Sequence, residues 1–153
     1  MNKKKGLLWV ALLLILLAFT GCTGSDDQYA PDKAAIETLV NDYFTAAFNI
    51  DYTTWTGENE LPFLTPDQAK IMQGRFADFK QSFVDNQLTQ AVDSVEIIRV
   101  NIETETSGNV YCIIKVSGYD NGSAYRETIE YSMPVKKIEG QWLIDDFKIQ
   151  SIE

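Results

Sequence analysis

The residue types that could do chemistry in this chain are few, and carboxylates dominate them. The chain has 153 residues and no histidine, so Ser–His and Cys–His nucleophile pairs and histidine metal sites are excluded. Cys112 lies in an apolar strand pattern, and no histidine exists to activate its thiol. Its expected role is that of a small core residue. We expect no cofactor and no bound metal.

Two acids, Glu127 and Asp145, fall at strand positions that should face an apolar core. A carboxyl in such surroundings is poorly solvated, which raises its pKa and would suit general-base catalysis near neutral pH. Asp145 is therefore the candidate catalytic base, with a structural role as the alternative. Glu127 is a candidate pocket residue, with a solvated rim position as the alternative. The two acids should lie about 20 Å apart along their strands, too far for a cooperating pair.

Aromatic residues supply the other pocket candidates. They stand in and just after the first predicted helix: Tyr43, Phe44, Phe48 and Trp55. Such residues at helical spacing can line a pocket mouth or fill the core. Further acids occur at Asp26-Asp27, Glu58 and Glu60, in segments that read as a tether and a loop. We interpret these as solvated charge.

The elements that must position these residues begin with a meander of four strands between Val95 and Ile149. Asn121-Gly122 suits a two-residue hairpin turn. With that loop, Val116 opposes Glu127 and Ile114 opposes Ile129. The apolar residues then share one face, while polar residues share the other, and this agreement fixes the register.

Two glycines suggest the flanking turns. Gly108 and Gly140 each suit the last position of a three-residue loop, where positive φ is needed. This loop length sets Ile98 against Val116 in the first hairpin. In the last hairpin it sets Asp145 against Met133 on the core face. Four residues should then emerge as a cluster on the outer face and form a dimer or docking surface: Tyr111, Ile113, Trp142 and Ile144.

Two helices are expected before the sheet. The first is capped by Asp32 and runs to about Asn49, with an apolar stripe for the sheet. The second begins at Thr65-Pro66 and ends before Gln90, with Gly74 interrupting it. Helices followed by an antiparallel meander predict an α+β domain with the helices packed on one face of a curved four-stranded sheet.

These features resemble a known superfamily. An aromatic-rich first helix, a second helix opened by Leu64-Thr65-Pro66, and a closing hairpin that reads EGQWLIDDF at residues 139–147 look like the NTF2-like superfamily. The resemblance implies a sheet that curls around the helices and leaves an open end for a ligand. Some members are isomerases or dehydratases with a pocket carboxylate, and many are non-catalytic binding or assembly domains. We find no sign of the short extra strands that many members place after the first helix. Cystatin-like packing is the nearby alternative.

The first 21 residues read as a signal peptide. Lys3-Lys4-Lys5 precede an apolar run from Leu7 to Ala18 that is short for a membrane span. The sequence before Cys22 resembles a bacterial lipobox, which implies that Cys22 is lipidated and becomes the mature amino terminus. The alternative is an ordinary signal peptide or short anchor. Several acyl chains on Cys22 would give stable membrane anchoring.

Charge excludes some partners. The chain has a formal charge of −9, and removal of residues 1–21, with three lysines and no acids, lowers it to −12. A nucleic-acid partner is therefore not expected.

The sequence predicts three segments: a lipoprotein signal peptide (1–21), a tether from Cys22 (22–31) and one domain (32–153). The predicted protein is extracytoplasmic and membrane-anchored, and it binds an envelope protein or a small apolar ligand without catalysis. The alternative is an isomerase or dehydratase with Asp145 as its base.

Overall fold

The computed structural model describes residues 28–153. The predicted signal peptide, Cys22 and Asp26-Asp27 lie outside the described residues. Residues 31–153 form one compact unit. None of the helices in the described part of the chain is long and apolar enough to cross a membrane.

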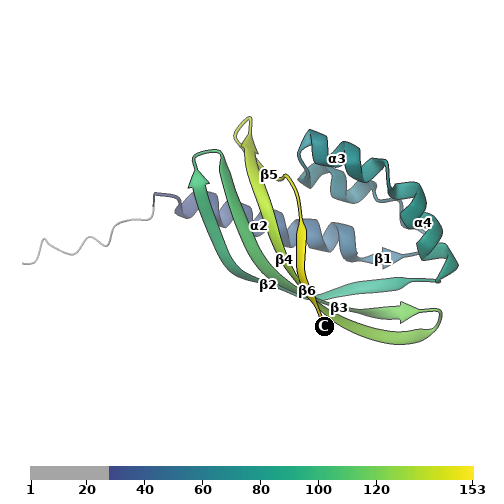
Figure 1. Ribbon diagram of the computed structural model, residues 1–153. Coiled ribbons are helices and arrows are strands. Elements are labelled where there is room, and N and C mark those ends of the chain that lie inside the picture. The colour runs from purple at the N-terminus through teal and green to yellow at the C-terminus, as the bar shows by residue number, and fades with distance from the viewer. Residues whose placement is uncertain (1–27) are drawn as a thin grey trace, which may run out of the picture. The chain divides into compact units, whose positions relative to one another are not determined.

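The helices precede five of the six strands of an antiparallel sheet, and the short first strand follows the first helix (Figure 1). The elements, in chain order, are α2 (Ala30–Phe48), β1 (Ile50–Asp51), the 3₁₀ helix η1 (Glu58–Phe63), α3 (Pro66–Gln73), α4 (Phe76–Asp85), β2 (Thr89–Thr104), β3 (Ser107–Asp120), β4 (Ser123–Ile138), β5 (Gln141–Ile144) and β6 (Lys148–Ile152). The strand order is β1-β2-β3-β4-β5, and β6 also pairs with β4. The α+β prediction is confirmed, but the prediction of four strands was wrong. The short β1 directly after α2 is one of the strands that the sequence did not reveal.

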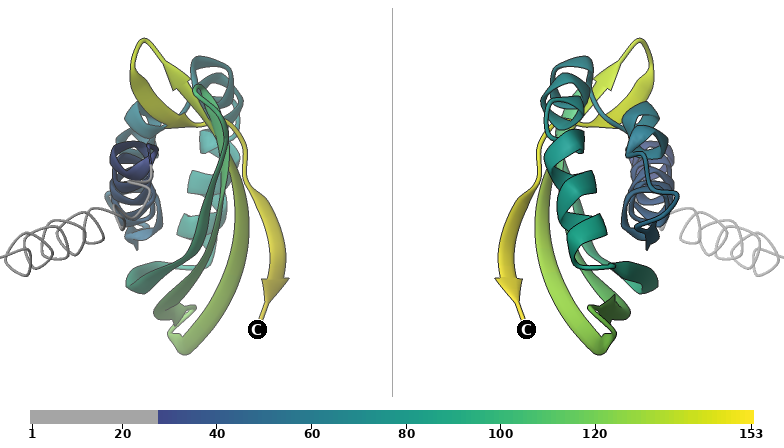
Figure 2. Two further views of the ribbon diagram at one scale, coloured as in Figure 1. Left: turned by 90° about the vertical axis from the view of Figure 1, so that its left-hand side faces the viewer. Right: turned by 90° about the vertical axis from the view of Figure 1, so that its right-hand side faces the viewer.

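Helix α2 crosses the concave face of the bent sheet (Figure 2). Helical spacing predicts an apolar stripe that ends at Phe48, which is partly buried. The other members of the stripe are buried: Ile36, Leu39, Val40, Tyr43, Phe44 and Ala47. Alternate residues of β3 and β4, among them Ile114 and Met133, complete the core from the sheet side. Cys112 is part of this core, and burial raises the pKa of its thiol to about 12. It is a core residue, as predicted.

The start of α2 differs from the prediction. Asp32 does not cap the helix but lies in its first turn. Its Oδ1 accepts a hydrogen bond from Lys137 Nζ at 2.7 Å and another from Trp142 Nε1 at 2.8 Å. These bonds tie the start of α2 to the β4–β5 hairpin, 105 and 110 residues away in sequence. The Asp32 carboxylate therefore bonds to the β4–β5 hairpin, which offers it two donors, and does not cap its own helix.

The predicted second helix is two helices. Thr65 caps α3 as expected, since its side chain accepts from the Gln68 N–H, and Pro66 follows at the first helical position. The chain then breaks at Gly74, and α4 begins at Phe76. The start of α3 lies beside the end of β5, where the Thr65 N–H donates to the Ile144 carbonyl, and α4 leads down to the start of β2 (Figure 1).

The central hairpin confirms the predicted register. Asn121 and Gly122 have φ of 48° and 80°, and Val116 pairs with Glu127 and Ile114 with Ile129. Turn chemistry and apolar alternation specify the same pairing here.

The β2–β3 register was predicted wrongly. The chain turns at Glu105-Thr106, and Gly108 pairs with Ile102 without positive φ. A Cβ on Gly108 would lie 2.8 Å from the Asn101 carbonyl oxygen, so glycine is needed for close backbone approach. Three register shifts interrupt β2. Ile98, expected in the core, is 56% exposed.

The β4–β5 hairpin also differs from the prediction. Glu139 and Gly140 both have positive φ, at 51° and 84°, which makes a two-residue turn. Val135 therefore faces Ile144 instead of Leu143. A shift by one residue moves every side chain of the strand to the other face. Trp142 and Ile144 are consequently buried in the core, not on the outer face.

Candidate functional site

A pocket of about 660 Å³ lies between the helices and the concave side of the sheet. It is lined mainly by aromatic and aliphatic side chains from α2, the segment after β1, α3, α4 and the final strands. The lining includes Tyr43, Ala47, Phe48, Trp55, Ile71, Met72, Phe79, Phe83, Leu88, Tyr131, Phe147 and Ile149. Glu60, Gln68, Arg75, Gln90 and Asp146 are its polar members. A concave apolar site with a few polar groups is typical of ligand binding.

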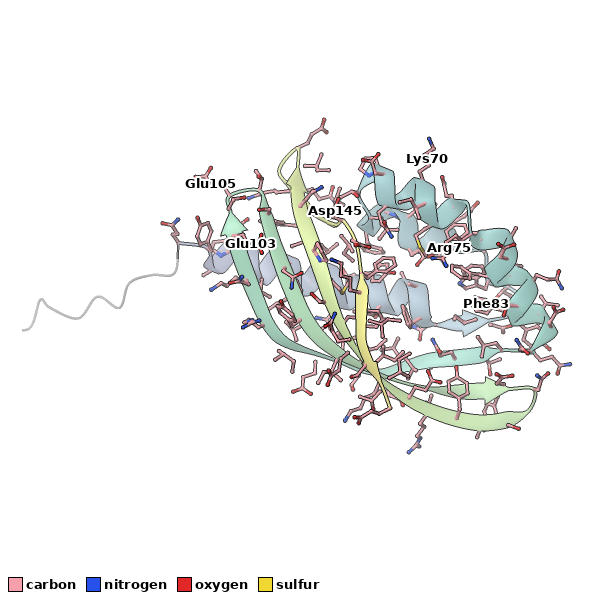
Figure 3. The ribbon with its side chains drawn as sticks, in the orientation of Figure 1. Lys70, Arg75, Phe83, Glu103, Glu105 and Asp145 are labelled. Carbon is pink, nitrogen blue, oxygen red and sulfur yellow. The ribbon has the colours of Figure 1, made fainter. Side chains whose placement is uncertain are left out.

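Local sequence explains how the walls form. Phe79 and Phe83 are four residues apart on α4, so both project from one side of that helix. Trp55, held by a turn in which its N–H donates to the Asp51 carbonyl, packs edge-on against Phe83 with ring centroids 4.9 Å apart. Figure 3 shows Arg75 and Phe83 at the two ends of the α4 segment. The aromatic wall is therefore built from helical spacing and one tight turn.

Glu60 is the unexpected residue of this pocket. It lies in η1, its side chain is buried at 5% exposure, and it lines the cavity. Burial raises the pKa of its carboxyl to about 7, against a hydrogen bond with the Tyr43 side chain that lowers it. Within residues 28–153 no salt bridge involves Glu60. The interpretation of Glu60 as solvated charge was wrong.

The pocket that Glu60 lines also contains two neutral tyrosines and two charged side chains. Burial raises the pKa of Tyr43 well above its usual value, and the nearby charge of Glu60 adds to that effect. Burial also raises the pKa of Tyr131, on the sheet side of the pocket, to about 12. Arg75 is exposed and lies over the Phe79 ring, 5.2 Å from its centroid. Asp146 also lines the pocket, and its Oδ1 accepts from the Phe147 N–H.

Asp145, the predicted base, lies outside the pocket. Its predicted position opposite Met133 was wrong, because the backbone N–H of Asp145 donates to the Pro134 carbonyl after β5 has ended. Its carboxylate forms a 2.8 Å ion pair with Lys136 and accepts from the Thr65 hydroxyl at 3.3 Å. Figure 3 shows it beside the start of α3, well separated from Phe83.

The other predicted pocket residues divide into two groups. Tyr43, Phe48 and Trp55 line the pocket. Phe44 is fully buried in the core and does not line it, and Glu127 is exposed on β4 near the β3–β4 turn.

The outer sheet face keeps only part of its predicted cluster. Tyr111 and Ile113 line a shallow groove of about 520 Å³ there. Arg99 lies 4.5 Å from the Tyr111 ring centroid, and Glu130 pairs with Ile113. With Trp142 and Ile144 buried, the apolar patch is smaller than the sequence predicted.

Sequence reasoning missed Glu60 because its burial depends on tertiary packing. The only local signal is the apolar Leu61 and the Phe63-Leu64 pair that follow it. In the part of the chain that the structure describes, no cluster of histidine, cysteine, aspartate and glutamate could hold a metal.

Known proteins resemble this chain in structure and not in sequence. No family model and no curated protein sequence matches the chain. An IcmL-like type IV secretion system protein from Legionella pneumophila aligns with a TM-score of 0.63 and 12% identity, covering 80% of this chain and 95% of that one. The intermembrane space region of the chloroplast protein ARC6 aligns with a TM-score of 0.58 and 17% identity, covering 76% and 94%.

A third structure carries a fold name. A Nostoc punctiforme protein of unknown function with a cystatin-like fold aligns with a TM-score of 0.53 and 16% identity, covering 81% of this chain and 92% of that one. At such identities the likeness shows the fold alone. The cystatin-like form of the fold prediction is confirmed.

Proposed function

We propose that this chain is a lipid-anchored, extracytoplasmic binding module whose pocket holds a small apolar ligand without catalysis. The observation that carries the proposal is the 660 Å³ cavity between α2, α3, α4 and the sheet. Its aromatic and aliphatic walls contact one another, as Trp55 and Phe83 do, but each also turns apolar surface toward the cavity. Other side chains do not cover this apolar surface, and a ligand bound in the cavity would bury it.

The location rests on separate support. The lipobox-like sequence before Cys22 supports lipidation, and the acidic tether and domain support a position off an anionic membrane surface. Two structural neighbours are described as part of a secretion system and as an intermembrane space region. These contexts support an extracytoplasmic domain that works beside envelope proteins.

A matched pair of substitutions tests the pocket. Ala47 lines the cavity, whereas the neighbouring Ala46 lies on another side of α2. Ala47→Phe should fill part of the cavity and abolish saturable binding of Nile red, an uncharged apolar dye, followed by its fluorescence. Ala46→Phe should bind the dye like the wild type. Unchanged saturable binding by a folded Ala47→Phe variant would reject the pocket.

The anchor has its own test. Cys22→Ser should release the domain from the membrane fraction or leave it unprocessed. Mass spectrometry that finds an unmodified mature terminus at another residue would end the lipoprotein proposal.

Glu60 supports a second candidate function, an isomerase or dehydratase. A pocket carboxyl with a pKa of about 7 is suited to taking and returning a proton at neutral pH. In this role Glu60 replaces Asp145, whose carboxylate is ion-paired outside the pocket. Wild type, but not Glu60→Gln, would then exchange deuterium from D₂O into the α-carbon of 2-tetralone. Equal exchange rates in the two proteins would exclude this activity for that ketone.

A protein partner on the outer sheet face is a separate proposal. Tyr111 and Ile113 could pack there against a second copy or an envelope protein. Sedimentation of wild type and Tyr111→Glu would show whether the face forms a homodimer.

A further inference from the structure

We propose that the pocket selects an apolar amine, whose ammonium group pairs with the Glu60 carboxylate while its hydrocarbon body packs against the aromatic walls. This inference rests on the proposed pocket function and adds the chemical class of the ligand. It follows from three features of the described residues: the burial of Glu60, the aromatic lining and the absence of a cation paired with that carboxylate.

The first feature is the cost of Glu60 as it stands. A carboxylate at 5% exposure is poorly hydrated, and a buried charge is costly unless it is paired. The two ion pairs formed within residues 28–153 use Asp32 and Asp145 instead. The Tyr43 side chain is its hydrogen-bond partner. An ammonium would supply the missing counter-charge together with charge-assisted hydrogen bonds.

The second feature is the wall around it. Tyr43, Trp55 and Phe83 line the same cavity as Glu60. The faces of aromatic rings attract cations, most strongly when water is excluded. This wall already shows the preference, because the Arg75 guanidinium lies over the Phe79 ring. A neutral apolar ligand would use the walls but leave Glu60 unpaired.

The third feature is the balance of charge among the titratable groups that line the pocket together with Glu60. Tyr43 on α2 and Tyr131 on β4 are neutral at physiological pH, since burial raises both pKa values. Asp146, between β5 and β6, adds a second acid, and the exposed Arg75, before α4, supplies the single cation of the lining. The cavity therefore has a net negative charge when Glu60 is ionised. The chain's formal charge of −9 attracts cations at longer range as well.

The pairing makes binding depend on pH. An ammonium pairs with the ionised carboxylate, so below pH 7 binding must first displace the Glu60 proton. Amine affinity should then fall by up to about tenfold for each pH unit below 7. Affinity for an uncharged ligand of the same shape should not follow this course.

Three adamantane probes of equal shape and different charge test the inference: 1-adamantanamine, 1-adamantanol and 1-adamantanecarboxylate. Calorimetric titration of the purified full chain at pH 8 should show the amine binding at least about tenfold more tightly than the alcohol. Glu60→Gln should remove this preference, so that the amine and the alcohol bind the variant with similar affinity. Glu58→Gln removes the same charge from an exposed position of the same 3₁₀ helix and should leave the preference intact.

The outcomes separate the inference from the proposed function. Equal affinity for amine and alcohol would overturn amine selection and leave the apolar pocket standing. Tighter binding of the carboxylate would overturn it in favour of anion recognition by Arg75. No binding of any probe, with Nile red binding indifferent to Ala47→Phe, would reject the pocket itself and the inference with it.

Discussion

The two ends of the space between α2 and the sheet differ in how tightly their apolar side chains pack and in whether their carboxylates are ion-paired. At one end, which we call the packed region, the buried side chains belong to one closed core: Ile36, Val40, Val110, Met133, Val135 and Ile144. Its carboxylates, Asp32 and Asp145, lie at the margin and are paired with Lys137 and Lys136. At the other end, the lining of the 660 Å³ pocket surrounds open space, and its buried carboxylate, Glu60, has no ion-pair partner among the described residues.

This difference separates residues that maintain the fold from residues available to a ligand. Lys137 and Trp142 donate to Asp32 and hold its pKa below the usual value, so its ionised form stabilises the native state. Burial has the opposite effect on Glu60 and raises its pKa to about 7. The ionised form of Glu60 therefore destabilises the native state until a cation binds it. We infer that the packed region stabilises the domain and that the pocket region is where binding energy can be gained.

The largest effect on stability should come from creating a cavity in the packed region. Ile144→Ala removes a fully buried side chain opposite Val135 and should lower the free energy of unfolding by about 2–5 kcal/mol. Urea denaturation followed by circular dichroism measures it. The control is Ile98→Ala, at a position 56% exposed, which should cost well under about 1 kcal/mol. A smaller effect of Ile144→Ala than of Ile98→Ala would place Ile144 on the outer face and Ile98 in the core, as the sequence suggested.

The second effect is the pH dependence that Glu60 imposes. Because its folded pKa of about 7 exceeds the ordinary value of 4.5, the folded state holds more protons than the unfolded state between these pH values. Stability should therefore fall as pH rises from 4.5 to 7, by on the order of 2–3 kcal/mol. Glu60→Gln should remove this fall and raise the thermal midpoint at pH 8, and Glu58→Gln should not. A wild-type midpoint that stays flat across this range would show that Glu60 is solvated.

Asp32 should show the opposite sign in the same titration. Its pKa is lowered in the folded state, from 3.8, so its stabilising contribution is present above that value and is lost as pH falls below it. Asp32→Asn should flatten the acid side of the stability profile and leave the Glu60 region unchanged.

Sequence patterns predicted the parts of this fold in which two local signals agree. The central hairpin combines Asn121-Gly122 with strict alternation, and its register was correct. In β2, shifts such as that between Ile97 and Arg99 break the alternation, so no period-2 pattern could locate the pairing. The last hairpin has positive φ at Glu139, which is uncommon for a residue other than glycine. For that reason the sequence did not predict a two-residue turn there.

The site was less predictable than the fold. Tyr43, Phe48 and Trp55 were identified from helical spacing and the turn that follows, and they do line the pocket. Glu60 was missed because a six-residue 3₁₀ helix has no hydrophobic period that would reveal a buried face. Asp145 was chosen because one wrong loop length moved its strand by one residue.

A substitution in the pocket wall should lower stability less than Ile144→Ala does, but it should weaken ligand binding more. Phe83 is half-buried and faces the cavity on one side, so Phe83→Ala loses fewer contacts than Ile144→Ala and should cost about 1–2 kcal/mol. It also removes the edge-on contact with Trp55, and Nile red affinity should fall severalfold. Val84→Ala, at an exposed neighbouring position of α4, is the control for helix propensity. Undiminished dye affinity in Phe83→Ala would remove α4 from the binding wall.

The smallest effect should come from Asp145, where the packed region ends. Its ion pair with Lys136 is partly open to solvent, with the lysine side chain 55% exposed, and exposed pairs contribute little because water and salt screen them. Asp145→Asn keeps an oxygen that can accept from the Thr65 hydroxyl, so the cap of α3 should survive. We expect a small loss in the thermal midpoint at low salt, disappearing in 1 M NaCl, and no change in Nile red affinity. Glu60→Gln provides the comparison, because its pH-dependent effect arises from a buried group and should persist in 1 M NaCl. Loss of dye binding in Asp145→Asn, with the fold intact, would instead connect Asp145 to the pocket and contradict the separation of the two regions.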